Sequence, residues 1–115
     1  MTTRDCIFCT MARDPSHEAP IYRDEQAFVV RDINPKAPVH LLIIPNRHLA
    51  SLAYVGPGQV PAMGHMFLVA EEMARRHDVT VSGYRLALNQ GQDAGQVIEH
   101  PHMHLLAGRP LGDMG

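Results

Sequence analysis

The sequence has neither a strong charge of one sign nor a long apolar run, and each absence excludes a class of function. Its 115 residues include 10 Lys and Arg against 12 Asp and Glu, so the formal net charge is −2. A chain without a basic excess has no patch that would bind a nucleic-acid backbone. No apolar run approaches the roughly 20 residues that a membrane helix needs, and residues 1–5 lack the apolar stretch of a signal peptide. We therefore expect a cytoplasmic protein that contacts neither nucleic acid nor membrane.

Cysteine is also scarce, with only Cys6 and Cys9 in a Cys-x-x-Cys spacing. In a reducing compartment this spacing indicates a metal half-site or a redox pair rather than a structural disulfide. The redox version usually lies at the start of a helix that follows a strand, and almost nothing precedes Cys6. The metal half-site is therefore the favoured interpretation, and two merely buried small residues are the remaining alternative.

Repeats and low-complexity segments are absent as well, and the order of the remaining patterns indicates an α+β fold. Apolar periodicity and breaker residues predict helices over 6–13 and 60–77, and strands over 21–22, 27–30, 39–44 and 84–89, with a last strand that carries the histidines. A strict strand–helix–strand alternation is missing, so we expect a mostly antiparallel sheet rather than a Rossmann-like one. The size fits a single domain over residues 1–115.

Three histidines at alternate positions, His100, His102 and His104, are the strongest chemical signal. In an extended strand, side chains two residues apart point to the same face. Imidazole titrates near neutrality, so such a row can bind a metal, accept a phosphate, or act as nucleophile and acid. If a backbone carbonyl holds one nitrogen of His102 as N–H, the other nitrogen presents a lone pair that can attack phosphorus.

Other side chains are candidates to support this chemistry. His104 and His40 could donate to a phosphate oxygen, and preorganised donors of this kind lower the barrier where charge develops. Glycines in the loop 91–96 allow backbone N–H groups to approach an anion, with the Gln96 amide beside them. Asp32 follows a strand, where a carboxylate can accept from ribose hydroxyls. Taken alone, His40 also fits a satisfied core histidine, and the loop 91–96 also fits a plain connection.

The pattern His-x-His-x-His followed by two apolar residues resembles the histidine triad (HIT) superfamily, and most closely its Hint branch. Further matching segments are Cys6–Cys9, Asp32–Pro35, Pro38–His40, Ile44–His48, Asn89, Gly95–Gln96 and Gly108–Pro110. The resemblance implies a five-stranded sheet with one long and one short helix, continued across a homodimer. It also implies a hydrolase that binds purine nucleotides, cleaves nucleoside phosphoramidates through a nucleotidyl-histidine, releases an AMP-like product, and needs no metal for the chemistry.

The resemblance also assigns roles to residues of this chain. His102 corresponds to the nucleophile, supported by His104, His40, Asn89 and Gln96. The positions that correspond to the nucleotide site are Phe8, Asp32, Ile33, Asn34, Asn89, Gly95, Gln96, Val97, His102 and His104. Bacterial members with the Cys-x-x-Cys pair often hold zinc, and the corresponding ligands are Cys6, Cys9, His48 and His100, a set that suits a closed tetrahedral structural site.

Three departures from the family pattern affect what we expect of activity. Val97 replaces a serine whose hydroxyl assists the phosphate or the leaving group, Pro101 removes an N–H between the first two histidines, and the C-terminus lacks the tryptophan of some Hint proteins. His-Pro-His also occurs in the galactose-1-phosphate uridylyltransferase branch, but glutamine follows there, so His104 favours hydrolysis over transfer. The alternatives are a nucleotide-binding regulatory protein with weak catalysis, which Val97 favours, and a metal-dependent hydrolase that uses the histidines as ligands.

Overall fold

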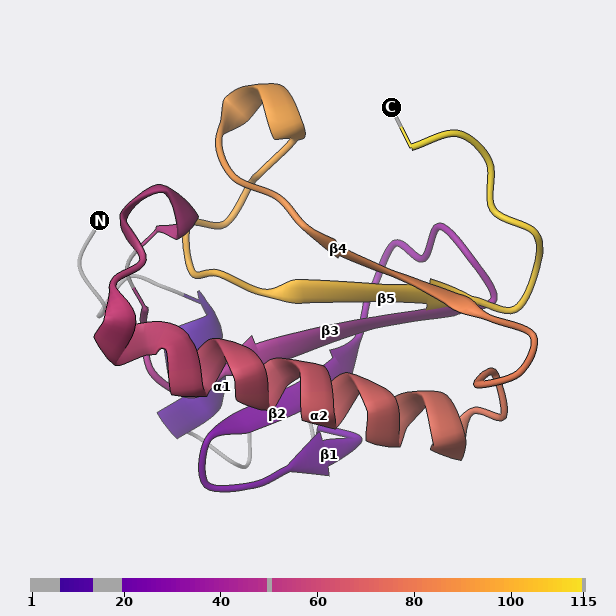
Figure 1. Cartoon of the computed structure of the whole chain (residues 1–115), viewed down its shortest axis with the longest axis horizontal. Helices are drawn as coiled ribbons and strands as arrows, with labels where there is room; N and C mark the ends of the chain where they lie inside the picture. Colours follow the sequence, from indigo (N-terminus) through magenta and orange to yellow (C-terminus); the bar gives the residue numbers. More distant parts are fainter. Residues whose placement is uncertain (1–6, 14–19, 50, 115) are drawn as a thin grey trace.

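The structure is a computed structural model that describes residues 7–13, 20–49 and 51–114, and it is built around one antiparallel sheet (Figure 1). The helices are α1 (Ile7–Arg13) and α2 (Val60–Arg76), and the strands are β1 (Tyr22–Arg23), β2 (Ala27–Arg31), β3 (Val39–Pro45), β4 (Tyr84–Leu88) and β5 (Met103–Ala107). The strand order is β1-β2-β3-β5-β4, and every neighbouring pair is antiparallel. The predicted α+β class with a five-stranded, mostly antiparallel sheet is therefore confirmed.

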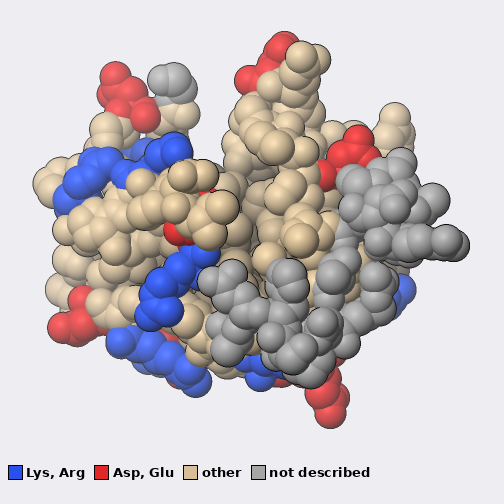
Figure 2. Space-filling view, turned by 180° about the vertical axis from the view of Figure 1, so that it is seen from behind, with Lys and Arg blue, Asp and Glu red and all other residues tan. Residues whose placement is uncertain are grey.

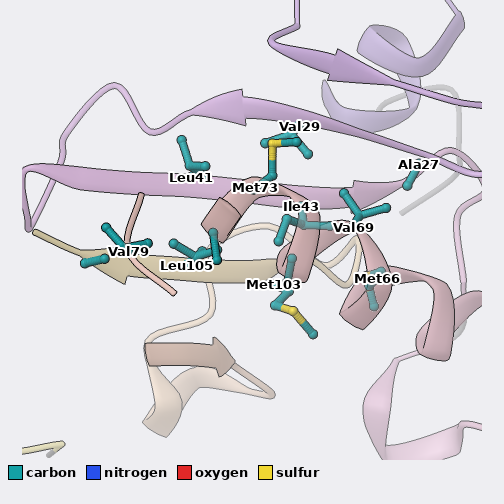
Figure 3. Packing of buried hydrophobic residues seen from close by; sticks show 13 residues of the cluster. Ala27, Val29, Leu41, Ile43, Met66, Val69, Met73, Val79, Met103 and Leu105 are labelled. Atoms are coloured by element: carbon teal, nitrogen blue, oxygen red, sulfur yellow. The ribbon is translucent and has the colours of Figure 1, made fainter. Parts of the chain in front are cut away.

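One face of the sheet packs against α2 to form the main core. Successive strand residues point to opposite faces, and Leu41 and Ile43 of β3 face the helix together with Met103 and Leu105 of β5 (Figure 3). From α2, the buried face consists of Met66, Val69, Ala70, Met73 and Ala74. These positions recur at the spacing of one helical stripe. The alternation in the strands and the periodicity of the helix therefore select the residues that pack together between the sheet and α2.

The opposite face of the sheet is covered at one end by α1. Phe8 and Cys9 are buried there against Phe28 and Ile44. Arg23 from β1 anchors the end of this short helix, because its guanidinium donates to the carbonyls of Met11 (3.1 Å) and Ala12 (3.3 Å). Carbonyls in the last turn of a helix have no partner within the helix, so Arg23 supplies one from a neighbouring strand.

The prediction that the last strand carries all three histidines was wrong in part. The strand β5 begins at Met103, so only His104 belongs to it, and His100 and His102 precede it. Pro101 has no N–H for a strand ladder, and His100 bonds through its ring to the Pro45 carbonyl at 2.8 Å, which holds the chain away from extended pairing.

The other boundaries agree with the predictions within one residue. The helix predicted over 60–77 ends at Arg76, and the strand predicted over 84–89 ends at Leu88. In the described part of the chain, the longest helix has 17 residues and none is long and apolar enough to cross a membrane.

Candidate functional site

The histidines gather on the face of the sheet that α2 does not cover. In the pairing of β3 with β5, Leu42 lies opposite His104 and His40 lies opposite Leu106. His40 and His104 are therefore diagonal neighbours on one face, a distance that long side chains can span. Their rings lie 5.2 Å apart, and the His102 ring lies 5.1 Å from that of His104.

The orientation of His102 is set by its own backbone. Its Nδ1 donates to the carbonyl oxygen of His100 at 2.8 Å. A carbonyl oxygen only accepts, so this nitrogen bears the proton and Nε2 of the neutral ring has a lone pair. Phe8 packs edge-on against the same ring with centroids 5.0 Å apart. The tautomer that nucleophilic attack requires is therefore the one that the local geometry selects.

His40 and His104 form a hydrogen-bonded pair beside it. The backbone N–H of Lys36 donates to His40 Nδ1 at 3.0 Å, so the proton of neutral His40 is on Nε2. His40 Nε2 lies 2.9 Å from His104 Nδ1 and 3.4 Å from Asp32 Oδ2. His104 Nδ1 must then accept, which leaves the proton of His104 on Nε2.

Burial keeps both of these rings neutral. Burial is the largest cause that lowers the pKa of His104 to about 4; the nearby rings of His102 and His40 add to this shift, and Asp32 opposes it. Burial also lowers the pKa of His40, with Asp32 opposing and Lys36 adding to the effect. In consequence, the site offers a lone pair on His102 and an N–H on His104, two residues apart.

Three of the predicted nucleotide-binding residues meet in one cavity. Phe8, Asp32 and Ile33 line a space of about 240 Å³, together with apolar side chains of α1, β2 and β3. Ile33 is 85% exposed, so its side chain is free to contact a bound molecule. Asn34 is also exposed, and its backbone N–H donates to Asp32 Oδ1 at 2.8 Å, which shapes the turn that carries the carboxylate.

The remaining predicted residues lie in the loop between β4 and β5, where their polar groups hold the loop together. Asn89 Nδ2 donates to the Ala94 carbonyl at 2.7 Å. Gln96 accepts from the Gly91 N–H at 2.8 Å and donates to the Ile98 carbonyl at 3.1 Å. Gly95 has φ +81°, a left-handed conformation that favours glycine. Gln96 and the exposed Val97 line a second cavity, of about 530 Å³.

A second cluster contains three of the four predicted metal ligands. Cys9 Sγ lies 3.3 Å from His48 Nδ1 and 3.4 Å from His100 Nδ1, and the three ligand atoms lie within 4.8 Å of one another. With Zn–S near 2.3 Å and Zn–N near 2.05 Å, a tetrahedral site needs S···N separations of about 3.5 Å. The fourth predicted ligand, Cys6, lies outside the described residues.

The outer contacts of this cluster also suit a metal. His100 Nε2 donates to the Pro45 carbonyl, which leaves Nδ1 unprotonated and directed toward Cys9. Metal-bound histidines usually have such an outer acceptor. Burial lowers the pKa of His100 to about 4, with His48 and His102 adding to the effect and the bond to Pro45 opposing it. The ring is therefore neutral near pH 7, as a ligand must be.

The sequence did not identify the residues outside the histidine cluster that hold His40 and the helix of Phe8 in place. Lys36 contributes through its backbone N–H, for which no side-chain pattern exists. Arg109 Nη2 donates to the Lys36 carbonyl at 2.7 Å across 73 positions of sequence, and Arg23 anchors the helix that carries Phe8. The available signals for these contacts were the match of Gly108–Pro110 to the family pattern and the position of Lys36 four residues before His40 in a proline-rich loop.

Charges of both signs lie on the histidine face. Seen from behind, Lys and Arg side chains lie mostly over the left half and the lower edge, Asp and Glu lie mostly at the top, the right and the lower corners, and uncharged residues lie between them (Figure 2). Among the described residues, both signs of charge are present on this face, so it does not present one sign alone to a polyanion. The site is instead suited to a small molecule held in a cavity.

Together, the sheet, its two helices and the histidine pair define a small α+β protein with an imidazole-based site. A family model described as the HIT domain matches residues 15–111. Over 110 residues the chain is 39% identical to the purine nucleoside phosphoramidase of Escherichia coli K12, covering 96% of this chain and 92% of that protein. The chain therefore belongs to the HIT family, and the resemblance found in the sequence is confirmed.

Solved structures agree with this assignment. A histidine triad protein from Clostridium difficile, 32% identical, superposes with a TM-score of 0.91 and covers 100% of both chains. A Zn-bound histidine triad family protein from Mycobacterium smegmatis, 29% identical, superposes with a TM-score of 0.75 and covers 94% of this chain and 78% of that chain.

Proposed function

We propose that this protein is a hydrolase that cleaves purine nucleoside phosphoramidates, or related nucleotidyl bonds, through a covalent nucleotidyl-histidine. The observation that carries the proposal is the bond from His102 Nδ1 to the His100 carbonyl, which leaves the Nε2 lone pair available for attack. The name of the Escherichia coli relative, purine nucleoside phosphoramidase, supports the substrate class. The product is an AMP-like nucleoside monophosphate.

The reaction proceeds in two displacements. His102 Nε2 attacks the α-phosphorus, a bond from nitrogen to phosphorus forms, and the bond to the leaving amine breaks, with the amine taking up a proton from solvent. Water then attacks the same phosphorus and gives up a proton to solvent, the bond to His102 breaks, and the nucleotide is released with the ring restored. Dividing one difficult displacement into two easier ones is the gain from a covalent intermediate. The N–H of His104 stabilises charge on the phosphoryl oxygens in both steps.

Substrate binding follows from the two cavities. We place the base and ribose in the cavity lined by Phe8, Asp32 and Ile33, with the Asp32 carboxylate accepting from ribose hydroxyls and Asn34 at its rim. We place the phosphate toward the loop of Asn89, Gly95, Gln96 and Val97, whose shape is fixed by bonds from the N–H groups of Gly95 and Gln96 to carbonyls of the same loop. His40 supports His104 from below and does not itself contact the substrate.

The nucleophile can be tested directly. His102→Ala should reduce turnover of adenosine 5′-monophosphoramidate by at least about a thousandfold, since it removes the attacking atom. The fold should survive, because His102 is only half-buried. His77→Gln, which alters a histidine at the end of α2, is the matched control and should retain full activity. Wild-type rates in the His102→Ala protein would refute the assignment.

Zinc is the proposed structural metal, held by Cys9, His48 and His100 together with Cys6. When bound, it would link α1 to the segment after β3 and to the segment before β5, and it would take no part in the displacement at phosphorus. Metal analysis of protein purified without chelator should give close to one equivalent of zinc. Removal by a chelator should lower the melting temperature by several degrees, since a bound metal stabilises the folded state. Less than about a tenth of an equivalent would contradict the proposal.

A second candidate is a nucleotide-binding protein with weak catalysis, favoured by the exposed Val97 in place of a hydroxyl. Tight binding of AMP with negligible turnover of amine, anhydride and thio leaving groups would support it. The metal-dependent alternative is disfavoured by the Lys36 N–H on His40 Nδ1, because a metal on Nε2 would force a proton onto a nitrogen that already faces a donor. A homodimer, a single domain over residues 1–115 and a cytoplasmic location remain predictions.

A further inference from the structure

A continuous chain of hydrogen bonds connects the segment after β5 with His104. Arg109 Nη2 donates to the Lys36 carbonyl at 2.7 Å, and the Lys36 N–H donates to His40 Nδ1 at 3.0 Å. His40 Nε2 in turn lies 2.9 Å from His104 Nδ1. The connection therefore passes through the backbone of Lys36 in the loop 32–38, whose N–H and C=O belong to the two peptide groups on either side of its Cα, then through β3 and then β5.

We propose that Arg109 is a positioning residue: by holding the backbone of Lys36 in place, it keeps the Lys36 N–H on His40 Nδ1 and so fixes the tautomers of His40 and His104, so that His104 presents an N–H beside His102. This inference rests on the proposed function, in which that N–H stabilises phosphoryl charge. It assigns to Arg109 a role that requires no contact with the substrate.

The backbone conformation at Gly108 allows the segment after β5 to approach the loop 32–38 closely. Gly108 has φ +100°, and a Cβ placed on it would lie 2.8 Å from Pro38 Cβ, closer than real Cβ contacts occur. Any other residue would force the two segments apart. Arg109 Nη1 also donates to the Pro110 carbonyl at 2.8 Å, which restrains the guanidinium against its own segment. Gly108 and Arg109 thus hold the segment after β5 in close contact with the loop 32–38, a contact that we call the clamp.

Loss of this clamp would allow the opposite pair of tautomers. If the Lys36 N–H no longer meets His40 Nδ1, that nitrogen can take the proton and His40 Nε2 becomes an acceptor. His104 would then donate from Nδ1 and present a lone pair where an N–H is needed, next to developing negative charge. Asp32 Oδ2, 3.4 Å from His40 Nε2, still favours the original tautomer. The expected result is therefore a mixture, with kcat lowered about tenfold rather than abolished.

The direct test is ¹⁵N NMR of the histidine rings, because protonated and unprotonated imidazole nitrogens resonate far apart. In the wild-type protein, His40 and His104 should both be protonated on Nε2. Arg109→Ala should mix the tautomers of both rings and lower kcat about tenfold, with KM changed less than threefold. Arg109→Lys keeps a side-chain donor, so it should retain most of the wild-type tautomer spectrum and most of the wild-type kcat. Arg85→Ala is the matched control, since Arg85 also donates to a carbonyl near the C-terminus, that of Gly112, but has no link to His40.

A second pair of variants tests the middle of the chain. Lys36→Pro removes the backbone N–H, whereas Lys36→Ala keeps it and removes only the side chain. Lys36→Pro should reproduce the Arg109→Ala spectrum, and Lys36→Ala should match the wild type. Unchanged tautomers in folded Arg109→Ala protein would overturn the inference, even where His102→Ala abolishes turnover. If the wild type has no turnover, the proposed function fails, but the NMR comparison still decides the role of Arg109.

Discussion

At the scale of single residues, three histidines of similar sequence context have three different states because each ring meets a different partner. His100 donates to the Pro45 carbonyl from Nε2, and His102 donates to the His100 carbonyl from Nδ1. His104 accepts at Nδ1 from His40. Since each contact determines which nitrogen bears the proton, the first ring is ready for a metal, the second for attack and the third for donation.

Val97 is one of the three departures from the family pattern expected from the sequence, and its effect can be measured. Val97→Ser should raise kcat about three- to tenfold, since a hydroxyl adds a donor or acceptor near the leaving group. The side chain is 91% exposed, so its replacement removes little core packing and the melting temperature should change by less than about 2 °C. Val97→Ala, which shortens the side chain without adding a hydroxyl, is the control. Equal rates for the two variants would show that the hydroxyl is not what this site lacks.

At the scale of elements, hydrogen bonds of polar side chains link both helices to the sheet outside the apolar core. Arg23 of β1 anchors the end of α1, and its guanidinium also lies over the Phe28 ring at 5.1 Å. Asp24, the next residue, connects β1 with α2, because His65 of α2 lies 2.7 Å from its carboxylate. Two neighbouring residues thus fix a helix on each face of the sheet.

The carboxylate of Asp24 makes the stability of this junction dependent on pH. Burial alone would raise the pKa of Asp24, but hydrogen bonds from Tyr22, Gln26, His65 and Ala27 outweigh it and lower the pKa from 3.8 to about 2. When the pKa of a carboxyl is lower in the folded chain than in the unfolded chain, the ionised carboxyl stabilises the fold at pH values above the unfolded pKa. This contribution disappears as the pH falls from about 3.8 through about 2. Because Asp24 is only partly buried, we expect a contribution of about 1 to 2 kcal/mol.

Asp24→Asn should therefore be less stable than the wild type by about 1 to 2 kcal/mol in urea unfolding at pH 6, and the difference should shrink toward pH 2. Its exposed neighbour provides the control, since Glu25→Gln should change the unfolding free energy by less than about 0.5 kcal/mol at either pH. A difference between Asp24→Asn and the wild type that stays constant from pH 6 to pH 2 would show that ionisation of this carboxyl is not responsible.

Elements with a regular apolar pattern were predictable, and elements shaped by non-local polar contacts were not. The run from Val39 to Ile44 and the stripe along α2 specify a strand and a helix by periodicity alone. The start of β5 was misplaced because alternation of histidines indicates a strand, whereas the bond from His100 to Pro45 joins residues 55 positions apart. The partners of Asn89 and Gln96 are likewise set by the fold of their own loop, which side-chain identity does not reveal.

At the scale of the whole molecule, the two faces of the sheet have separate tasks. The face under α2 holds the main apolar core, and the opposite face holds the histidines, Asp32 and the Cys9 cluster. Most candidate site residues were identifiable because their residue types are chemically distinctive and follow the HIT pattern. The contacts that orient them, from the Lys36 backbone and Arg109, depend on how distant segments approach one another and become visible only in the fold.

The edge of the sheet at β4 and the exposed face of α2 are the surfaces suited to contact a second copy of the chain. β4 is an edge strand in the strand order, so its outer backbone groups are unpaired within the sheet and suited to continue it in a second copy. Phe67 and Leu68 of α2 are 52% and 64% exposed, an apolar surface that a dimer would cover. These features support the predicted homodimer with a shared sheet.

The combined substitution of Phe67→Glu and Leu68→Glu should convert a dimer to a monomer in sedimentation velocity at micromolar concentration, since it places two like charges from each copy in the interface. Ile33→Glu is the matched control: Ile33 is also apolar and is 85% exposed, but it follows β2, which three strand positions separate from β4 in the sheet. That variant should remain dimeric. A wild-type protein that sediments as a monomer would contradict the homodimer, and a double variant that remains dimeric would place the interface away from this face of α2.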